Sequence, residues 1–142
     1  MFLYWLDKKR FGGSSEPYIS DLPFLQSIEI GGIVCLQEKK DSKELAQLLN
    51  IPYLHRPIPD FDIPTKRDIE DIIEFFTHLQ QKKSNVPIVV HCTAGNGRTG
   101  TVIASIIKIV DKKSAELAIK AVRDVNPLAI ETPEQEKFVR DL

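Results

Sequence analysis

The chain has 142 residues, of which 42% are hydrophobic and 27% are charged, and its formal net charge at pH 7 is -1. This composition is typical of a single folded domain, here residues 1–142, and it excludes an intrinsically disordered chain. The balanced charge gives no indication of nucleic acid as a partner. No apolar run approaches the roughly 18 residues that a membrane span requires, so we expect no membrane association.

The first half of the chain alternates short apolar runs with segments of helical spacing. Runs rich in β-branched and aromatic residues predict strands over residues 2–6, 32–36 and 51–58. Apolar residues at helical spacing predict helices over residues 19–30, starting near Ser20, and over residues 42–50.

Two segments in this half are interpreted as loops. The segment 10–18, with Gly12 and Gly13, reads as a surface turn, with the alternative that it borders a functional pocket. Residues 59–64, PDFDIP, contain two prolines and two aspartates, which break regular structure. His55 and Arg56 precede this second loop and are interpreted as a polar strand end.

The second half of the chain predicts longer helices around one buried strand. A helix over residues 65–83 begins at Thr65, which Asp68 can help to cap, and the continuous apolar run 86–90 predicts a strand buried on both faces. Further helices are expected over residues 101–110 and 115–125, and from Thr132 with Pro133 in the first turn. Strands alternating with helices predict an α/β fold, with a mainly parallel sheet of about four to five strands and helices on both faces.

The two cysteines, Cys35 and Cys92, are too few for a disulfide framework and lack the spacing of a zinc site. We therefore expect a cytoplasmic protein that needs neither a metal nor a cofactor. An isolated cysteine at the end of a buried strand is usually inert, and Cys35 fits that description. Cys92 lies in a different context.

The stretch 89–102, VVHCTAGNGRTGTV, is open to two interpretations. Its glycines at positions 95, 97 and 100 spell GxGxxG between a strand and a helix, as in dinucleotide-binding proteins. That fingerprint also needs a second strand ending in an acidic residue about 20 positions later, where this chain predicts a helix. The NTPase motif GxxxxGK[ST] is absent.

The alternative interpretation starts from Cys92 and Arg98, which are separated by five residues. A short glycine-rich loop over a helix N-terminus directs several backbone N–H groups into one concave site, where they and the helix dipole stabilise an anion. The same donors stabilise a thiolate, and the guanidinium fork of Arg98 matches two oxygens of a tetrahedral oxyanion. This pattern predicts a loop that holds a phosphoryl group and attacks it.

HCTAGNGRTG resembles the HCxxGxxR[ST] signature of the cysteine-based protein tyrosine phosphatases, most closely the small single-domain dual-specificity branch. The resemblance implies that Cys92 is the nucleophile, that Arg98 binds phosphate and that Thr99 assists the leaving sulfur. It also implies a general acid in the loop before the nucleophile, where Asp60 lies 32 residues ahead of Cys92. Gln135 matches the water-positioning glutamine of the family. The expected phosphate-binding residues are Thr93, Ala94, Gly95, Asn96, Gly97 and Arg98.

Several assignments keep an alternative. Asp62 competes with Asp60 as the general acid, although Asp60 directly follows Pro59, as in the family. Gln135 could be a residue of the helix surface. His91 could tune the thiolate through the loop, or satisfy backbone groups at the strand end.

The resemblance implies a metal-independent phosphatase of phosphotyrosine, and of phosphoserine and phosphothreonine, that acts through a phosphocysteine. Phosphorylated proteins would be its partners, phosphate or vanadate would bind in the loop, and the protein would be a monomer. Relatives that act on inositol phospholipids often carry lysines in this loop, which bind the extra phosphates. The uncharged residues Thr93, Ala94 and Asn96 therefore argue against an inositol phospholipid as substrate. The alternatives are a non-protein phosphate, such as an RNA 5′ end or an inositol phosphate, and a non-catalytic phosphate-binding module.

Overall fold

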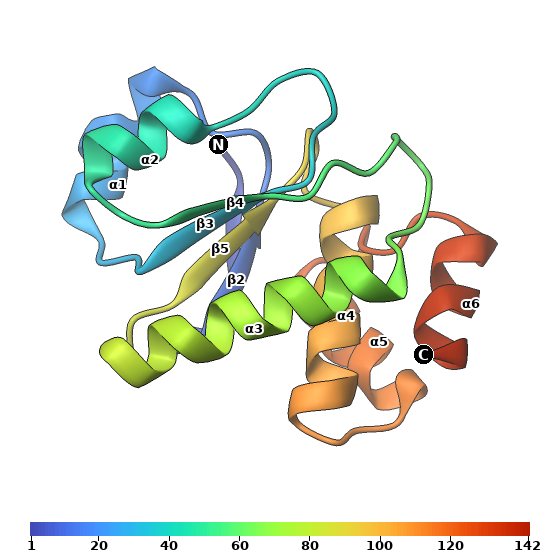
Figure 1. Ribbon diagram of the computed structural model, residues 1–142. Helices are drawn as coiled ribbons and strands as arrows, with labels where there is room; N and C mark the ends of the chain where they lie inside the picture. The colour runs from blue at the N-terminus through green and yellow to red at the C-terminus, as the bar shows by residue number, and fades with distance from the viewer.

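The computed structural model describes residues 1–142 as a five-stranded sheet with helices packed on both faces (Figure 1). The strands lie in the order β1-β2-β5-β3-β4, and only β1 runs antiparallel to its neighbour. The strands are β1 Leu3–Asp7, β2 Phe11–Ser14, β3 Gly32–Cys35, β4 Tyr53–His55 and β5 Ile88–His91. The predicted α/β class with a mainly parallel sheet is confirmed.

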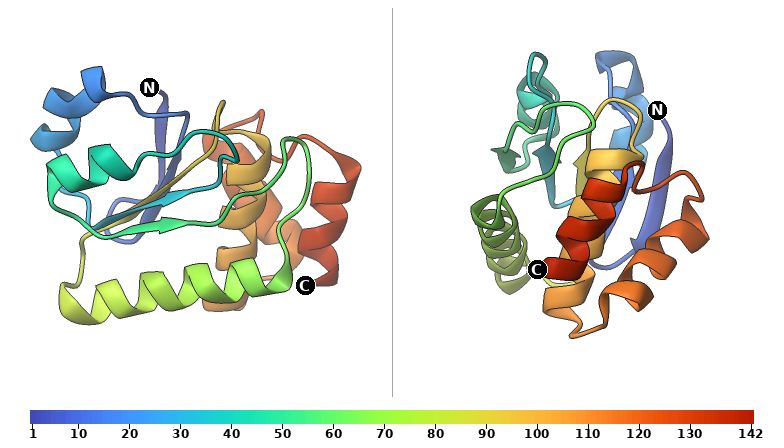
Figure 2. Two further views of the ribbon diagram at one scale, coloured as in Figure 1. Left: turned by 45° about the horizontal axis from the view of Figure 1, so that its top comes forward. Right: turned by 90° about the vertical axis from the view of Figure 1, so that its right-hand side faces the viewer.

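The helices divide between the two faces of the sheet (Figure 2). One face carries the short 3₁₀ helix η1, Ile19–Asp21, followed by α1, Leu22–Ser27, and α2, Lys43–Leu49. The other face carries α3, Lys66–Lys82, α4, Gly97–Val110, α5, Ala115–Val125, and α6, Pro133–Asp141. No helix is both long and apolar enough to cross a membrane.

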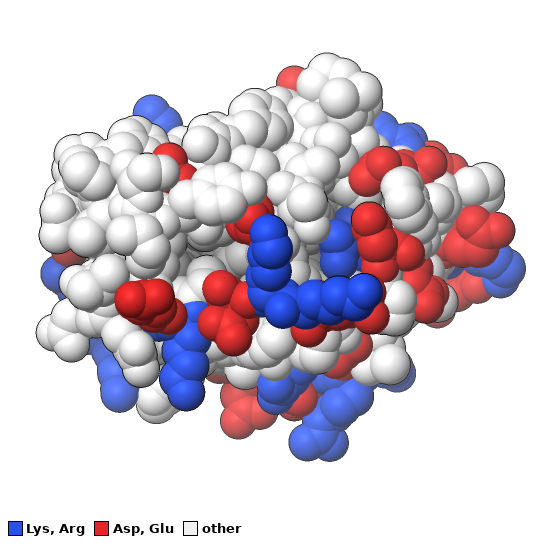
Figure 3. All heavy atoms as spheres, turned by 90° about the horizontal axis from the view of Figure 1, so that it is seen from above, with Lys and Arg blue, Asp and Glu red and all other residues white.

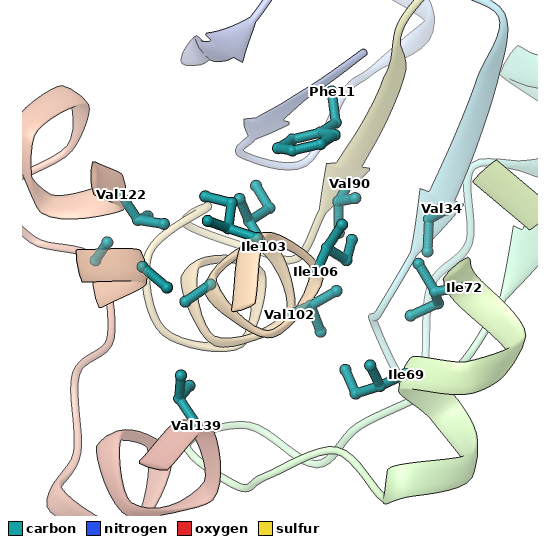
Figure 4. Packing of buried hydrophobic residues seen from close by; sticks show 14 of the residues in the cluster. Phe11, Val34, Ile69, Ile72, Val90, Val102, Ile103, Ile106, Val122 and Val139 are labelled. Atoms are coloured by element: carbon teal, nitrogen blue, oxygen red, sulfur yellow. The ribbon is translucent and has the colours of Figure 1, made fainter. Parts of the chain in front are cut away.

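The central strand β5 contributes to both cores, because successive side chains of a strand point to opposite faces. Val89 packs with the smaller cluster under α1 and α2, whereas Ile88 and Val90 pack with the larger cluster. Figure 4 shows Ile103 and Ile106 of α4 in the middle of this larger cluster. The prediction that the 86–90 run is a strand buried on both faces is therefore confirmed.

The interpretation of segment 10–18 as a surface turn is wrong for its first part. Residues 11–14 form β2, which is completely buried between β1 and β5. The two glycines serve close packing rather than a turn: a Cβ at Gly13 would lie 2.5 Å from the ring of Tyr4, and one at Gly12 would lie 2.6 Å from Tyr4 O. Residues 15–18 then cross the edge of the sheet at which β5 ends.

Other elements differ from prediction mainly at their ends. The strand expected over residues 51–58 is limited to residues 53–55, where it pairs with β3. The helix expected over residues 101–110 begins four residues earlier, at Gly97, so that its first turn belongs to the glycine-rich loop. Thr65 caps α3 through a reciprocal pair of hydrogen bonds with Asp68, as expected.

Candidate active site

The segment 92–96 joins the carboxyl end of the central strand β5 to the N-terminus of α4. The loops after β2, β3 and β4 begin at the same edge of the sheet, because these three strands point in the same direction as β5. Residues from loops that are far apart in the sequence therefore meet around Cys92. Ligands of open α/β sheets commonly bind at such an edge.

Several carbonyl groups of this phosphate loop, residues 92–98, accept hydrogen bonds from other parts of the protein. The hydroxyl of Tyr4 donates to Gly95 O at 2.7 Å, and the backbone N–H of Ile130 donates to Asn96 O at 3.1 Å. Glu16 N donates to Thr93 O at 2.9 Å. In contrast, the N–H groups of residues 93–96 donate to no acceptor of the protein. With its carbonyls bound on the outside and its amides unpaired, the loop has the arrangement that an anion-binding cradle requires.

Gly95 has a φ of +84°, in the region that favours glycine. A Cβ at this position would lie 2.7 Å from the carbonyl carbon of Ser14 and from the amide nitrogen of Ser15. Backbone atoms cannot rotate out of the way as a side chain can. The loop therefore depends on glycine here for both conformation and space.

Cys92 lies at the base of the loop with only 3% of its surface exposed. The hydroxyl of Thr99, in the first turn of α4, donates to Cys92 Sγ at 3.0 Å. The helix N-terminus adds positive potential at the same point. Thiol, hydroxyl and amides are thus brought together as the motif requires.

Arg98 is almost fully buried and connects the phosphate loop to the loop after β4. Its Nη1 donates to Ile58 O at 2.9 Å, and its Nη2 donates to Thr93 Oγ1 at 3.2 Å. The same Nη2 lies 3.3 Å from Asp60 Oδ1 in an ion pair, although the Asp60 side chain is 62% exposed. The guanidinium is thus hydrogen-bonded to Ile58 O and Thr93 Oγ1, and its Nη2 also pairs with the exposed carboxylate of Asp60.

The two candidate acids differ in what they contact. Both carboxylates accept a hydrogen bond from the next backbone amide, Asp60 Oδ1 from Phe61 N at 3.0 Å and Asp62 Oδ1 from Ile63 N at 2.7 Å, but only Asp60 also pairs with Arg98. The Asp62 carbonyl accepts from Gln135 Nε2 at 3.2 Å. The geometry brings Asp60 to the phosphate loop and turns the carboxylate of Asp62 toward its own loop.

Gln135 is fully buried, so the interpretation as a helix-surface residue is wrong. Its Oε1 accepts from Glu131 N and Thr132 N and caps α6, while its Nε2 reaches the Asp62 carbonyl. A Cβ on Gly97 would lie 3.1 Å from Gln135 Nε2, which places the amide against the phosphate loop. One N–H of this amide has no hydrogen-bond acceptor in the protein.

His91 is buried beneath the loop, and burial lowers its pKa from 6.5 to about 4. The ring is therefore neutral at physiological pH, with Nε2 2.7 Å from Ser42 Oγ and Nδ1 3.3 Å from Cys92 O. A neutral ring donates from one nitrogen only, and the carbonyl requires that donor to be Nδ1. His91 holds the backbone of the nucleophile and places no full positive charge beside the sulfur.

The remaining polar residues near the site have structural partners. His55 Nε2 bonds to Gln37 O, and Arg56 pairs with Asp71 of α3, as expected of a polar strand end. Cys35 is buried between β3 and its neighbours, as expected. No cluster of three or more His, Cys, Asp or Glu side chains could hold a metal ion.

Sequence reasoning missed several residues that build the site. Tyr4, Asn126, Glu16 and Gln37 contact the phosphate loop from four separate parts of the chain. Their distance in sequence left no local signal. A correct assignment of residues 11–14 as a strand beside β5 would have pointed to Glu16, which follows that strand directly.

Comparison with known proteins agrees with this geometry. The sequence profile of a family described as the DSP-PTPase phosphatase of polymorphic toxin systems matches residues 9–111. The protein is a cysteine-based phosphatase of the protein tyrosine phosphatase superfamily. The predicted family is confirmed.

The phosphatase is similar to proteins of very different size. It is 37% identical to the uncharacterised protein MJ0215 of Methanocaldococcus jannaschii over 84% of this chain and 74% of that one. It is 32% identical to human tyrosine-protein phosphatase non-receptor type 4 over 72% of this chain but only 11% of that protein.

Among solved structures, the phosphatase is similar to Tk-PTP in its active form, with 26% identity, a TM-score of 0.89, and coverage of 99% of this chain and 95% of that one. A structure of PTPMT1 in complex with PI(5)P has the same fold, with 19% identity, a TM-score of 0.86, and coverage of 99% and 94%.

Proposed function

We propose that the phosphatase hydrolyses phosphotyrosine, and also phosphoserine and phosphothreonine, in proteins, through a phosphocysteine and without a metal. The observation that carries the proposal is the position of Cys92 Sγ, 3.0 Å from the Thr99 hydroxyl and beneath a loop whose amides have no protein acceptor. A thiolate there can attack phosphorus while the amides bind the oxygens.

In the first step, the sulfur of Cys92 forms a bond to phosphorus as the bond to the ester oxygen breaks. Asp60 gives its proton to that oxygen, and Arg98 with the loop amides holds the other three phosphoryl oxygens. The 3.3 Å contact between Arg98 and Asp60 supports this assignment through position alone, because it brings the carboxyl group next to the guanidinium that would bind the phosphoryl group.

In the second step, water attacks phosphorus and the bond to sulfur breaks. Asp60 takes a proton from the water, Gln135 orients the water with its free N–H, and Thr99 donates a hydrogen bond to the departing thiolate. Inorganic phosphate and the thiolate of Cys92 are the products, so the cycle needs no external cofactor.

A protein substrate is favoured by the charges around the site. Thr93, Ala94 and Asn96 place no lysine in the phosphate loop, so a second phosphate of an inositol ring would find no cation there. The face seen from above in Figure 3 mixes Lys and Arg with Asp and Glu, and the run of basic side chains at its centre is flanked by acidic ones. Such a surface suits a folded or extended phosphoprotein better than a polyanion such as RNA.

The proposal predicts hydrolysis of a simple aryl phosphate in the presence of a metal chelator and inhibition by vanadate. Cys92→Ser should reduce turnover below detection while the protein still binds a phosphotyrosine peptide, because the cradle is unchanged. Cys35→Ala is the matched control, since Cys35 is the only other cysteine and lies outside the loop, and it should retain activity.

The substrate class is tested by comparing phosphopeptides, a phosphoinositide and a 5′-phosphorylated RNA at equal concentration. The highest kcat/KM on phosphopeptides is the expected result. A preference for the phosphoinositide or the RNA would replace the protein substrate, and a strict metal requirement would contradict the phosphocysteine mechanism.

A further inference from the structure

A buried hydrogen-bonded chain leads from β2 to the arginine of the phosphate loop. Glu16 follows β2 and is only 8% exposed, and Gln37 follows β3 and is 5% exposed. Gln37 Nε2 donates to a carboxylate oxygen of Glu16 and to Thr93 Oγ1 at 3.3 Å. Thr93 Oγ1 also accepts from Arg98 Nη2 at 3.2 Å. The catalytic motif supplies only the last two of these residues.

The charge of Glu16 sets the direction of every bond in this chain. Burial alone would raise the pKa of Glu16, but hydrogen bonds from Gln37 and Tyr18 and the charge of Lys40 outweigh it and hold that pKa below its ordinary value. An ionised carboxylate only accepts hydrogen bonds. The amide nitrogen of Gln37, not its oxygen, must therefore face Glu16 and, on the same NH₂ group, Thr93.

The hydroxyl of Thr93 is then restricted as well. A hydroxyl oxygen accepts two hydrogen bonds and donates one. Gln37 and Arg98 take both acceptor positions, so the proton of Thr93 is left as a donor. Thr93 is exposed, at the rim of the loop, so this proton is available to an oxygen of a bound phosphoryl group.

We infer that Glu16 and Gln37 are positioning residues for catalysis, which fix the Thr93 hydroxyl as a holder of Arg98 and as a donor to the phosphoryl group. The inference rests on the proposed function and extends it to two residues outside the signature motif. Their effect on the reaction should pass through Thr93.

The test is the double variant Glu16→Met with Gln37→Met, which replaces a buried polar pair by apolar side chains of similar length. Removing both partners leaves no buried charge unpaired, since Lys40, which pairs with Glu16, is 73% exposed. The melting temperature should therefore change by no more than about 4 °C. Loss of the positioned hydroxyl should lower kcat/KM on an aryl phosphate about 10-fold and weaken vanadate inhibition by a similar factor. A folded double variant with the kinetics of the original protein would overturn the inference.

The exchanged pair, Glu16→Gln with Gln37→Glu, provides a second route if the double methionine variant does not fold. The two side chains can still bond to each other, but the carboxylate at position 37 would now take the proton of Thr93. We expect a folded protein with kcat/KM reduced at least about 10-fold. Kinetics equal to those of the original protein would contradict the inference here too.

A double-mutant cycle with Thr93→Val decides whether the effect passes through Thr93. In the Thr93→Val background, the methionine pair should lower kcat/KM by less than about 2-fold, and Thr93→Ser should retain most of the activity. The same 10-fold loss in both backgrounds would contradict the inference. Gln80→Met is the matched control, because Gln80 lies in α3 and bonds to Val86 O, far from the loop. If the unaltered protein does not hydrolyse aryl phosphates, the proposed function fails instead.

Discussion

The phosphate loop and the acid loop, residues 59–64, face each other across Arg98 but are built in opposite ways. In the phosphate loop, the carbonyls of Thr93, Gly95 and Asn96 are bound by groups from other parts of the fold. In the acid loop, residues 59–63 are all exposed, and its contacts to the rest of the chain include those from Arg98 and Gln135. A preorganised cradle therefore meets a proton donor that is held by few contacts.

The largest expected effect concerns the acid loop and separates its two aspartates. Asp60→Asn should lower kcat on an aryl phosphate by about 10²- to 10⁴-fold, because an amide cannot protonate the leaving oxygen. Asp62→Asn should change kcat by less than about 3-fold, since its carboxylate bonds only within the loop. Single-turnover kinetics with both variants measure this difference. The reverse ranking would make Asp62 the acid.

Gly95→Ala tests the phosphate loop. The substitution requires an alanine at a φ of +84° and a Cβ 2.7 Å from the backbone of Ser14. We expect a loss of about 3 kcal/mol or more in the free energy of unfolding, from conformational strain and displacement of β2 together. Chemical denaturation measures it, and unchanged stability with full activity would show that the loop is less rigid than its hydrogen bonds indicate. Gly31→Ala, at a glycine far from the site whose Cβ would mainly meet the side chain of Val86, is the control.

The contrast between the loops also explains what the sequence could predict. The phosphate loop depends on local features, a buried strand, glycines and a helix start, and from these features the sequence predicted one loop that contains Cys92 and Arg98. Tyr4 and Glu16 come near the phosphate loop only because β1 pairs with β2 and β2 pairs with β5. Gly12 and Gly13 led to the prediction of a turn instead of β2, since glycine occurs in turns as well as in tightly packed strands.

The protonation of His91 should make the free energy of unfolding depend on pH between about pH 6.5 and pH 4. The pKa of His91 is lowered from 6.5 to about 4 in the folded protein, so the unfolded chain binds more protons in between. The contribution of neutral His91 to the free energy of unfolding is fully present above pH 6.5 and is lost as the pH falls toward 4. Between pH 7 and pH 5 the loss should be about 2 kcal/mol. Glu16, His55 and Arg98 are the charged or titratable groups that act on the ring besides its burial.

Urea denaturation at several pH values tests this dependence on His91. His91→Asn should flatten the curve between pH 7 and pH 5, whereas His78→Asn should leave it unchanged, because His78 is exposed on α3. If the His91→Asn variant keeps the slope of the original curve, another group titrates in this range. The buried histidine would then not be one of the features that set the phosphate loop apart from the acid loop.

The smallest effect belongs to Phe61 in the acid loop, which has a φ of +64° although its side chain is bulky and 59% exposed. Asparagine tolerates this conformation better, and little packing is lost from an exposed ring. Phe61→Asn should therefore raise the free energy of unfolding by up to about 1 kcal/mol, while Ile63→Asn, without a positive φ, should not. If Phe61→Asn instead destabilises the protein, the ring packs on a surface that holds the acid loop in place. The difference between a fixed cradle and a weakly held acid would then be smaller than the contacts imply.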